Sequence, residues 1–539
     1  MNCNKPLGFL FLVFLAVLAM SSPVAEAVAE KELNPRQSVA FWDEVIRLDP
    51  KDAGAYNKRG LAYRSLGQYQ KAIEDYSKAI RLDPKFAQAY YNRGVVYKQL
   101  KQYQSALEDY NSAIQLEPNN AHAYRQRGVV FKKLGLYERA IQDYDRAIAL
   151  KPDYAKAYNN RGAAYKKIGK FKRAIENYDK AIGLNSEDPV FFNNRGVAYK
   201  NLGRYAQAIK DLNRAIELDP YNPVFYGNKG NVYAKTRKYY RAIEDYNRAI
   251  GLNPKDGWVY NNRGVAYKKL GKYHQAIEDY NKAILIDPKD AVAYYNRGIA
   301  YKNLGMFQLA IEDFNRAIEL DPKNASFYRN RGVAFKKLGQ YKRAIEDYDR
   351  AIRLKPDYAR AYNNRGLAYK KLGEHKKALA DYNRAIKLEP DNAWFYNNRG
   401  VVYKNLDRPR DAIKDYNRAI ELNSNIATFY INRGDVYKNF GQYQLALNDF
   451  SRAIDLEPKN ARIYNSRGII YRNLGRPKRA MADFHQAIRL DPKYAAAYTN
   501  RGIGYISEGE YERACKDFTK ACELGDCTYL TWAERHGDC

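Results

Sequence analysis

Apolar and aromatic residues recur along this chain at the spacing of an amphipathic α-helix, and the whole pattern repeats every 34 residues. In the first unit, Tyr56 and Tyr63 precede a turn at Gly67, and a second apolar series follows it. Residues spaced by three, four and seven positions lie on one face of a helix. The pattern predicts two helices per unit, residues 53–66 and 69–82 in the first, joined by a turn and packed as an antiparallel pair.

The repeat is uninterrupted over most of the chain. Its eighth position is glycine in fourteen consecutive units, from Gly60 to Gly502, when positions are numbered from Ala53. A fixed period of this length is typical of a solenoid, in which each unit buries its apolar face only against its neighbours. We therefore expect an all-α fold without a single central core, and a function carried by an extended, repeated surface.

The repeat resembles that of the tetratricopeptide repeat family, in the form of an exported bacterial-type array. The match covers residues 53 to about 526 and is mildly broken where Ser186, Ser424 and Asp526 replace the closing proline and Leu212 replaces an aromatic residue. The resemblance implies a right-handed α-solenoid superhelix of antiparallel helix pairs with a concave, partner-binding groove. The residues that carry it in the first unit are Tyr56, Gly60, Tyr63, Ala72, Tyr76, Ala79 and Pro84.

The two ends of the chain differ from the repeats. An apolar run after Lys5 is followed by Ala25-Glu26-Ala27, the small-x-small pattern of a secretory cleavage site, so residues 1–27 are predicted to be a signal peptide. An uncleaved anchor or interfacial helix is the alternative. Residues 28–52 are predicted to be a degenerate capping half-repeat, residues 53–526 the fourteen repeats, and residues 527–539 a C-terminal cap.

The formal net charge of the chain is +31. The leader contributes one lysine and one glutamate, so the excess belongs to the exported part of the chain. A strong positive charge predicts anionic partners. Export favours an acidic protein segment or an anionic envelope polymer, whereas nucleic acid binding requires that the leader be retained inside the cell.

Two charged positions recur inside each unit. Position seven is arginine in thirteen repeats, as in Arg59, and lysine in the other, Lys229, while a second-helix position is aspartate in thirteen repeats, as in Asp75, and Asn177 in one. We predict an arginine–aspartate pair between the two helices of each repeat, with the arginine stem packed on tyrosines. The alternative is that these arginines face the ligand.

Position six is asparagine in eleven repeats. An amide side chain offers one acceptor and two donors and so suits pairing with the peptide groups of an extended ligand. The row resembles that of the repeat domain of O-linked N-acetylglucosamine transferase, which implies a groove for extended polypeptide. The alternative is a helix cap or a solvated helix face. The predicted ligand-binding asparagines are Asn92, Asn160, Asn194, Asn228, Asn262, Asn296, Asn330, Asn364, Asn398, Asn432 and Asn500.

Other positions of the first helix fall on the same side. Position nine is apolar in twelve repeats, and position twelve is basic in twelve, which predicts an apolar strip beside a row of cations that attracts polyanions. A solvated face is the alternative. Trp258 and Trp394 at position two, and Tyr91 and Tyr295 at position five, are candidate anchor residues or wedges between helices. The predicted ligand-binding lysines are Lys98, Lys132, Lys166, Lys200, Lys268, Lys302, Lys336, Lys370, Lys404 and Lys438.

Four cysteines lie in the last 25 residues. An even cluster in an exported protein indicates disulfides. Cys515 and Cys522 lie seven residues apart on one helix, about 10.5 Å by the helical rise, which is too far to bridge. We predict Cys515–Cys539 and Cys522–Cys527, fixing a short terminal helix over residues 528–535. A metal site is the alternative, although the spacing does not follow that of zinc ligands.

No catalytic pattern is present. The five histidines are scattered over different repeats, and the chain has no phosphate-binding glycine loop or helical zinc-protease motif. We expect a chain that is not an enzyme and needs no cofactor. The predicted function is a cell-envelope scaffold, located in the periplasm or at the cell surface, that holds extended acidic polypeptide segments. The alternative is a binder of anionic polysaccharide in an envelope export or assembly system.

Overall fold

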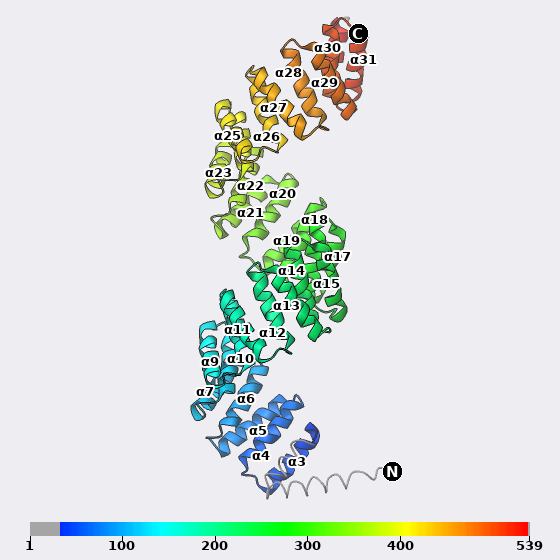
Figure 1. Ribbon diagram of the computed structural model, residues 1–539. Coiled ribbons are helices and arrows are strands. Elements are labelled where there is room, and N and C mark those ends of the chain that lie inside the picture. Colours follow the sequence, from blue (N-terminus) through cyan, green and yellow to red (C-terminus); the bar gives the residue numbers. More distant parts are fainter. Residues whose placement is uncertain (1–32, 537–538) are drawn as a thin grey trace, which may run out of the picture. The chain divides into compact units, whose positions relative to one another are not determined.

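The computed structural model describes residues 33–536 and residue 539 (Figure 1). It divides into two compact units between Leu270 and Gly271. Every regular element in these residues is a helix. The first unit contains α3 (Pro35–Leu48), α4 (Ala53–Ser65), α5 (Tyr69–Leu82), α6 (Ala87–Gln99), α7 (Tyr103–Leu116), α8 (Ala121–Lys133), α9 (Tyr137–Leu150), α10 (Ala155–Lys167), α11 (Phe171–Leu184), α12 (Pro189–Asn201), α13 (Tyr205–Leu218), α14 (Pro223–Lys235), α15 (Tyr239–Leu252) and α16 (Gly257–Lys269).

The second unit continues the same series of first and second helices of successive repeats. It contains α17 (Tyr273–Ile286), α18 (Ala291–Asn303), α19 (Phe307–Leu320), α20 (Ala325–Lys337), α21 (Tyr341–Leu354), α22 (Ala359–Lys371), α23 (His375–Leu388), α24 (Ala393–Asn405), α25 (Pro409–Leu422), α26 (Ala427–Asn439), α27 (Tyr443–Leu456), α28 (Ala461–Asn473), α29 (Pro477–Leu490), α30 (Ala495–Ser507), α31 (Tyr511–Glu523) and α32 (Thr528–His536). The predicted all-α solenoid of helix pairs is confirmed.

Within each unit, a helix packs against the helices that precede and follow it in sequence. The helix α6, for example, contacts α5 and α7, and contacts the first helices α4 and α8 less extensively. The even-numbered helices from α4 to α30 are the first helices of their repeats, and the odd-numbered helices that follow them are the second helices. Each repeat therefore buries its apolar face against its neighbours, as a solenoid requires.

A glycine and a large ring allow the two helices of a pair to approach closely. The ring of Tyr76 is fully buried, and a Cβ atom added to Gly60 would lie 2.7 Å from its Cε1 atom. The corresponding distance is also 2.7 Å for Gly128 against Tyr144. Glycine is thus needed at Gly60 and Gly128 because a side chain there would overlap the buried aromatic ring of the second helix.

The turn inside each pair requires a left-handed backbone. The φ angle of Gly67 is +73°, a conformation that only glycine adopts without steric cost. The same turn position is held by Lys101, Arg237 and Asp407 in three repeats, with φ angles of 61°, 59° and 55°. These three residues carry local backbone strain that the packing of the flanking helices overcomes.

The predicted arginine–aspartate pair joins the two helices of the repeat and is confirmed within both units. In the first repeat, Arg59 Nε donates to Asp75 Oδ2 at 2.8 Å and Nη2 donates to Asp75 Oδ1 at 2.6 Å. The arginine side chain is 19% exposed and the aspartate 7%. Equivalent pairs are Arg93–Asp109, Arg127–Asp143, Arg195–Asp211, Arg297–Asp313, Arg331–Asp347, Arg365–Asp381, Arg399–Asp415, Arg433–Asp449, Arg467–Asp483 and Arg501–Asp517.

The same arginines also bind the preceding second helix, a contact that the sequence analysis missed. The Nη1 atom of Arg59 donates to Asp43 at 2.7 Å, and that of Arg331 donates to Asn315 at 2.7 Å. Each arginine therefore reaches residues 16 positions before and 16 positions after itself. A bidentate pair plus a third bond fixes both the helix pair and its stacking on the previous repeat.

The helix at each end covers an open end of the stack. In α3, Phe41, Trp42 and Val45 are buried and pack against Ala55 of the first full repeat. At the other end, Ala533 of α32 packs against Ala514 and Phe518 of α31. Both helices lie where the sequence analysis expected caps, and the helix predicted over residues 528–535 is present. The predicted signal peptide, residues 1–27, lies outside the described residues.

Candidate functional site

The first helices form the candidate surface, and its charge is almost entirely of one sign. We call the side defined by positions two, five, six, nine, twelve and thirteen the first-helix face. Within the fourteen first helices, the only acidic residue is Asp435, whose carboxylate pairs with Lys438 at 3.1 Å. The carboxylates that balance the position-seven arginines lie on the second helices. The first-helix face is therefore cationic along both units.

Most position-six asparagines donate a hydrogen bond to the position-five residue of the preceding repeat. Asn92 Nδ2 donates to Asn57 Oδ1 at 2.9 Å, and Asn330 Nδ2 donates to the Tyr295 hydroxyl at 2.9 Å. The acceptor is the position-five residue of the preceding repeat, so these amides help to join repeats. Their role in ligand binding stays a prediction. The equivalent bonds are Asn194–Asn159, Asn228–Asn193, Asn398–Asn363, Asn432–Asn397 and Asn500–Asn465.

The position-five residue decides whether this bond forms. The preceding position-five residue is glycine for Asn262, and Asn262 Nδ2 is buried without a partner among the described residues. Asn160 and Asn364 follow Arg125 and Arg329, which cannot accept a hydrogen bond. Asn296 is buried. The sequence analysis did not consider position five as a hydrogen-bonding partner. Its frequent asparagine, adjacent to the position-six asparagine, was a visible signal for this role.

The position-twelve lysines are half-buried in both units rather than fully solvated. Their ammonium groups point toward the next repeat, because Lys98 Nζ donates to Gln126 at 2.7 Å and Lys302 Nζ donates to Asn330 Oδ1 at 3.1 Å. Burial and nearby cations lower the pKa of Lys98, Lys166 and Lys336 to about 8. The predicted row of lysines is thus partly desolvated and repels itself.

Neighbouring lysines interact along each unit. Lys132 and Lys200, one repeat on either side of Lys166, both contribute to the lowered pKa of Lys166. In the second unit, Arg329 and Lys370 act in the same way on Lys336. A row of like charges at this spacing creates a positive potential that an anionic ligand would relieve.

Position nine forms a half-buried apolar strip, and one of its exceptions has a structural reason. In most repeats the hydroxyl of the buried second-helix tyrosine has no partner among the described residues, as in Tyr144 and Tyr348. In the repeat where Asn231 replaces the apolar residue, Tyr246 donates to Asn231 Oδ1 at 2.8 Å. Asn231 therefore satisfies a buried hydroxyl.

The two candidate tryptophans are partly exposed and partly packed. Trp258 is 47% exposed, and its Cζ3 atom would lie 2.9 Å from a Cβ added to Gly227 of the preceding repeat. Trp394 is 45% exposed and its ring centroid lies 5.1 Å from that of Phe429. Each indole thus lies against an adjacent repeat and leaves about half of its surface in solvent. A role in ligand binding stays a prediction.

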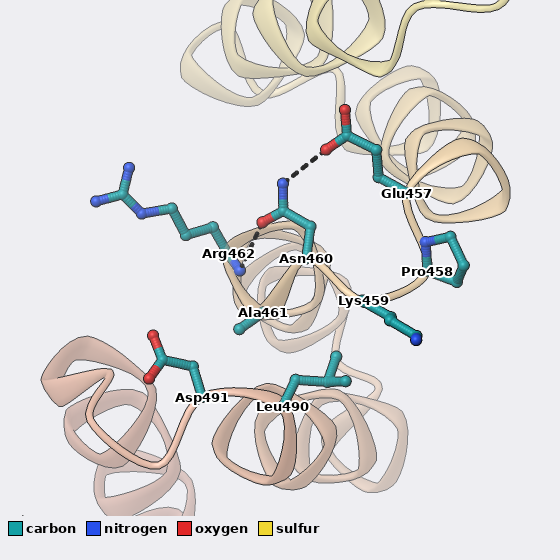
Figure 2. A pocket seen from close by; sticks show the side chains of 8 residues that line it. All are labelled: Glu457, Pro458, Lys459, Asn460, Ala461, Arg462, Leu490 and Asp491. Atoms are coloured by element: carbon teal, nitrogen blue, oxygen red, sulfur yellow. Dashed lines mark hydrogen bonds between the residues drawn. The ribbon is translucent and has the colours of Figure 1, made fainter. Parts of the chain in front are cut away.

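The clearest clefts lie in the turns between repeats. One is bounded by the turn from Glu457 to Asn460 and by Leu490 and Asp491 of the next repeat (Figure 2). Asn460 connects the two ends of that turn, donating to Glu457 at 2.8 Å and accepting from the Arg462 amide at 3.2 Å. Similar clefts recur at the turns 117–122 and 388–394. They come from the stacking geometry, and the position-six and position-twelve residues do not line them.

The repeat sequence matches established family models. The model described as tetratricopeptide repeat matches residues 87–120, 155–188, 189–222, 223–256, 257–290, 291–324, 359–392, 393–426 and 461–494, which together exceed half of the chain. The chain belongs to the tetratricopeptide repeat (TPR) family. Further TPR models match most of the remaining repeats, including residues 60–101, 133–169, 334–373 and 440–475, residues 41–74 and 314–346 and residues 495–524.

Several solved TPR structures are similar. The anaphase-promoting complex hetero-tetramer Cut9–Hcn1 is 18% identical with a TM-score of 0.49, covering 89% of this chain and 94% of that chain. A TPR protein from Parabacteroides merdae is 25% identical with a TM-score of 0.37, covering 44% and 95%. YrrB, described as a TPR protein with an unusual peptide-binding site, is 24% identical with a TM-score of 0.30, covering 35% and 96%. No curated protein matches the sequence significantly.

TPR proteins bind protein or peptide partners and are typically non-catalytic, and this chain is accordingly a protein-interaction scaffold. In the described residues, no group of histidine, cysteine and acidic side chains is arranged to hold a metal ion. None of the described helices has both the length and the hydropathy needed to cross a lipid bilayer.

The C-terminal cysteines of the TPR chain lie in the predicted pairs. Cys515 is bonded to Cys539, with Cα atoms 5.5 Å apart, and Cys522 to Cys527, with Cα atoms 3.9 Å apart. The first bond ties the end of the chain to α31, and the second closes the turn before α32. The formation of these bonds in the folded protein stays a prediction, since it requires an oxidising compartment.

Proposed function

We propose that this TPR chain is an exported scaffold of the cell envelope that holds extended, acidic polypeptide segments along its first-helix face. The observation that carries the proposal is the segregation of charge, because fourteen first helices contain one carboxylate, that of Asp435. Keeping half-buried lysines without carboxylates costs desolvation and repulsion energy. Carboxylates from a ligand would offset that cost.

The repeat spacing supports an extended ligand. Packed helices lie about 8–10 Å apart, and an extended chain advances about 3.3 Å per residue, so one repeat faces roughly three ligand residues. The Oδ1 atoms of Asn228, Asn398 and Asn432 accept no hydrogen bond within the described residues, whereas their Nδ2 atoms are engaged. These asparagines are therefore suited to accept hydrogen bonds from ligand N–H groups, and the lysines supply the electrostatic attraction.

The proposal is tested by binding of a fluorescein-labelled deca-glutamate peptide, measured by fluorescence anisotropy at low and high salt. Lys132, Lys166 and Lys200 are changed together to glutamine. The matched control changes three exposed second-helix lysines of the same unit, Lys172, Lys180 and Lys210, to glutamine. Both variants lose the same charge, so only the location of the lost lysines differs.

We expect the first-helix variant to raise Kd at least about tenfold and to reduce the dependence of binding on salt, because close charge pairs are lost. The control is expected to stay within about twofold of the unchanged chain, since it alters only long-range, screened charge. Equal effects of the two variants would show that net charge, and not the first-helix face, governs binding. Absence of binding at low salt would contradict the proposal as a whole.

A second candidate function is the binding of an anionic polysaccharide, which the half-exposed indoles of Trp258 and Trp394 favour. Aromatic faces can stack on sugar rings, and the cations would attract acidic groups. Binding of polygalacturonate that depends on both tryptophans, together with weak binding of deca-glutamate, would favour this function over the first.

The proposed export has its own test. The full chain, expressed with residues 1–27 in a bacterial host, is recovered from the periplasm and its N-terminus is sequenced. We expect a protein that begins at Val28. Recovery of the intact chain from the cytoplasm alone would contradict export and leave the binding experiments unaffected.

A further inference from the structure

Two arginines on the first-helix face differ from the other arginines of the stack. Position five is asparagine in half of the repeats, and it is arginine only at Arg125 and Arg329. The position-seven arginines pair with carboxylate or amide side chains on the second helix of their own repeat, and most also contact a polar side chain on the preceding second helix. Arg125 and Arg329, in contrast, have hydrogen bonds only to tyrosines among the described residues. In the part of the chain that the structure describes, no carboxylate pairs with either guanidinium group.

In the first unit, Arg125 is held by the turn that closes its own repeat and leads into the next. Its Nε atom donates to the Tyr154 hydroxyl at 2.6 Å, and its Cζ atom lies 5.4 Å from the centre of the Tyr154 ring. The Tyr154 hydroxyl also lies 2.8 Å from His122 Nδ1, and Lys151 lies 5.6 Å from the same ring. The two Nη atoms of Arg125 have no partner in the described part of the chain, which leaves the end of the guanidinium group for a ligand.

In the second unit, Arg329 lies against the equivalent tyrosine, Tyr358, but contacts it through a different nitrogen. Arg329 Nη1 lies 3.5 Å from the Tyr358 hydroxyl, its Cζ atom lies 5.8 Å from the ring centre, and Lys355 lies 5.5 Å from that ring. The Nε atom of Arg329 is buried without a partner in the described residues. The corresponding residues of the two units are separated by 204 residues, or six repeats, as in Arg125 and Arg329 or Tyr154 and Tyr358.

Each of these arginines lies between two half-buried lysines of position twelve. Arg125 contributes to the lowered pKa of Lys98 and Lys132, and Arg329 contributes to that of Lys302 and Lys336. The Nζ atom of Lys98 donates to Gln126 at 2.7 Å and that of Lys302 donates to Asn330 at 3.1 Å, and each acceptor is the residue next in sequence to the arginine, so these charges lie close together. The arginine, one lysine from the same helix and one from the preceding first helix thus form a cluster of three cations in each unit.

We propose that these two clusters are equivalent carboxylate-binding sites, one in each unit, through which the chain binds acidic polypeptide segments at two points. The inference rests on the proposed function and deepens it by assigning its strongest contacts. The two Nη atoms of Arg125, and Nη2 of Arg329 together with the second N–H of its Nη1, can donate two parallel hydrogen bonds to a carboxylate, and the flanking lysines add charge. The tyrosine fixes the orientation of the arginine before the ligand arrives, which lowers the entropy lost on binding.

The test uses the full chain and a fluorescein-labelled peptide of four consecutive glutamates flanked by neutral residues, which is short enough to occupy one site. Arg125 and Arg329 are changed to glutamine singly and together. The matched control carries Arg146→Gln and Arg350→Gln, two exposed second-helix arginines that are also six repeats apart. Circular dichroism shows that each variant keeps its helices.

We expect two binding sites per chain, one in each single variant, and at least about a tenfold weaker affinity in the double variant. The control should keep two sites and an affinity within about twofold, because its arginines are remote from the face. The double variant R125K/R329K keeps the charge but not the planar guanidinium group, and we expect its affinity to lie between those of the control and of the double glutamine variant.

The inference would be overturned if both single variants still had two binding sites, or if the double glutamine variant had the same affinity as its control. Either result would leave the proposed function in place. If R125K/R329K binds as tightly as the unchanged chain, two-point recognition by the guanidinium group is wrong. If the peptide binds none of the proteins and deca-glutamate does not bind either, the proposed function fails together with the inference.

Discussion

The replacement of Lys229 by arginine is expected to stabilise the chain locally and to change its response to pH. Lys229 is the only lysine at position seven, and its Nζ atom donates to Asp245 Oδ1 at 3.0 Å. The Oδ2 atom of Asp245 is buried without a partner among the described residues. Burial raises the pKa of Asp245 from 3.8 to about 6. An arginine at this position would supply the missing bond to Oδ2 and a further bond to Asn213 on the preceding second helix.

The magnitude follows from the raised pKa. Asp245 binds its proton more tightly in the folded state, so its contribution to stability is present below about pH 4 and is lost as the pH rises through about 6. A pKa raised from 3.8 to about 6 corresponds to about 3 kcal/mol of destabilisation at neutral pH. Burial also raises the pKa of Asp313, but two bonds from Arg297 counter this rise. We therefore expect K229R to recover about 2 kcal/mol at pH 7.5.

Hydrogen exchange followed by mass spectrometry is the suitable assay, because repeat arrays open locally. Amides of α14 and α15 should exchange about thirtyfold more slowly in K229R at pH 7.5, and the gain should be much smaller at pH 4.5 after correction for intrinsic rates. The reverse variant R297K should speed exchange in α18 and α19. A K229R protein with unchanged exchange at pH 7.5, or with the same gain at both pH values, would refute the reasoning.

Three further predictions concern the packing and the charged face. Gly128→Ala should destabilise its repeat by about 1–2 kcal/mol, because the new Cβ atom would lie 2.7 Å from the buried ring of Tyr144. Gly434→Ala, whose new Cβ atom would lie 3.2 Å from its nearest neighbour, should be neutral or stabilising in the same hydrogen-exchange assay. Tyr246→Phe should cost about 1 kcal/mol by removing its bond to Asn231, whereas Tyr348→Phe, which removes a hydroxyl without a partner in the described residues, should stay within about 0.5 kcal/mol in thermal unfolding. Binding of deca-glutamate should weaken between about pH 7 and pH 9 and should be coupled to proton uptake, because the lysines whose pKa lies at about 8 lose their charge in this range when free and regain it beside carboxylates. Calorimetry in buffers of different ionisation enthalpy measures this uptake, and binding without proton uptake would contradict the prediction.

The sequence predicted the repeat structure well because its signals lie within one unit. The expected helices 53–66 and 69–82 correspond to Ala53–Ser65 and Tyr69–Leu82, and the arginine–aspartate pair joins positions only 16 residues apart. Turn glycine, helical periodicity and complementary charge all point to the same local arrangement, so each supports the others.

Contacts between repeats were harder to predict, since they join residues 28 to 35 positions apart. Asn92 was interpreted by its chemistry alone, and its bond to Asn57 depends on how one repeat rotates on the next. The same holds for Arg125, whose orientation is set by Tyr154 in the turn that joins its repeat to the next. Each position-five asparagine is followed by a position-six asparagine in the next repeat, and this pattern was visible in the sequence.

The central claim is that acidic polypeptide lies along the first helices. Its most direct test is photo-crosslinking of a deca-glutamate peptide that carries one benzophenone group, with the attachment sites on the full chain mapped by mass spectrometry. We predict attachment at positions two, five, nine and thirteen of the first helices, most densely near Arg125 and Arg329. Attachment spread over the second helices, or confined to the turns between repeats, would contradict this account.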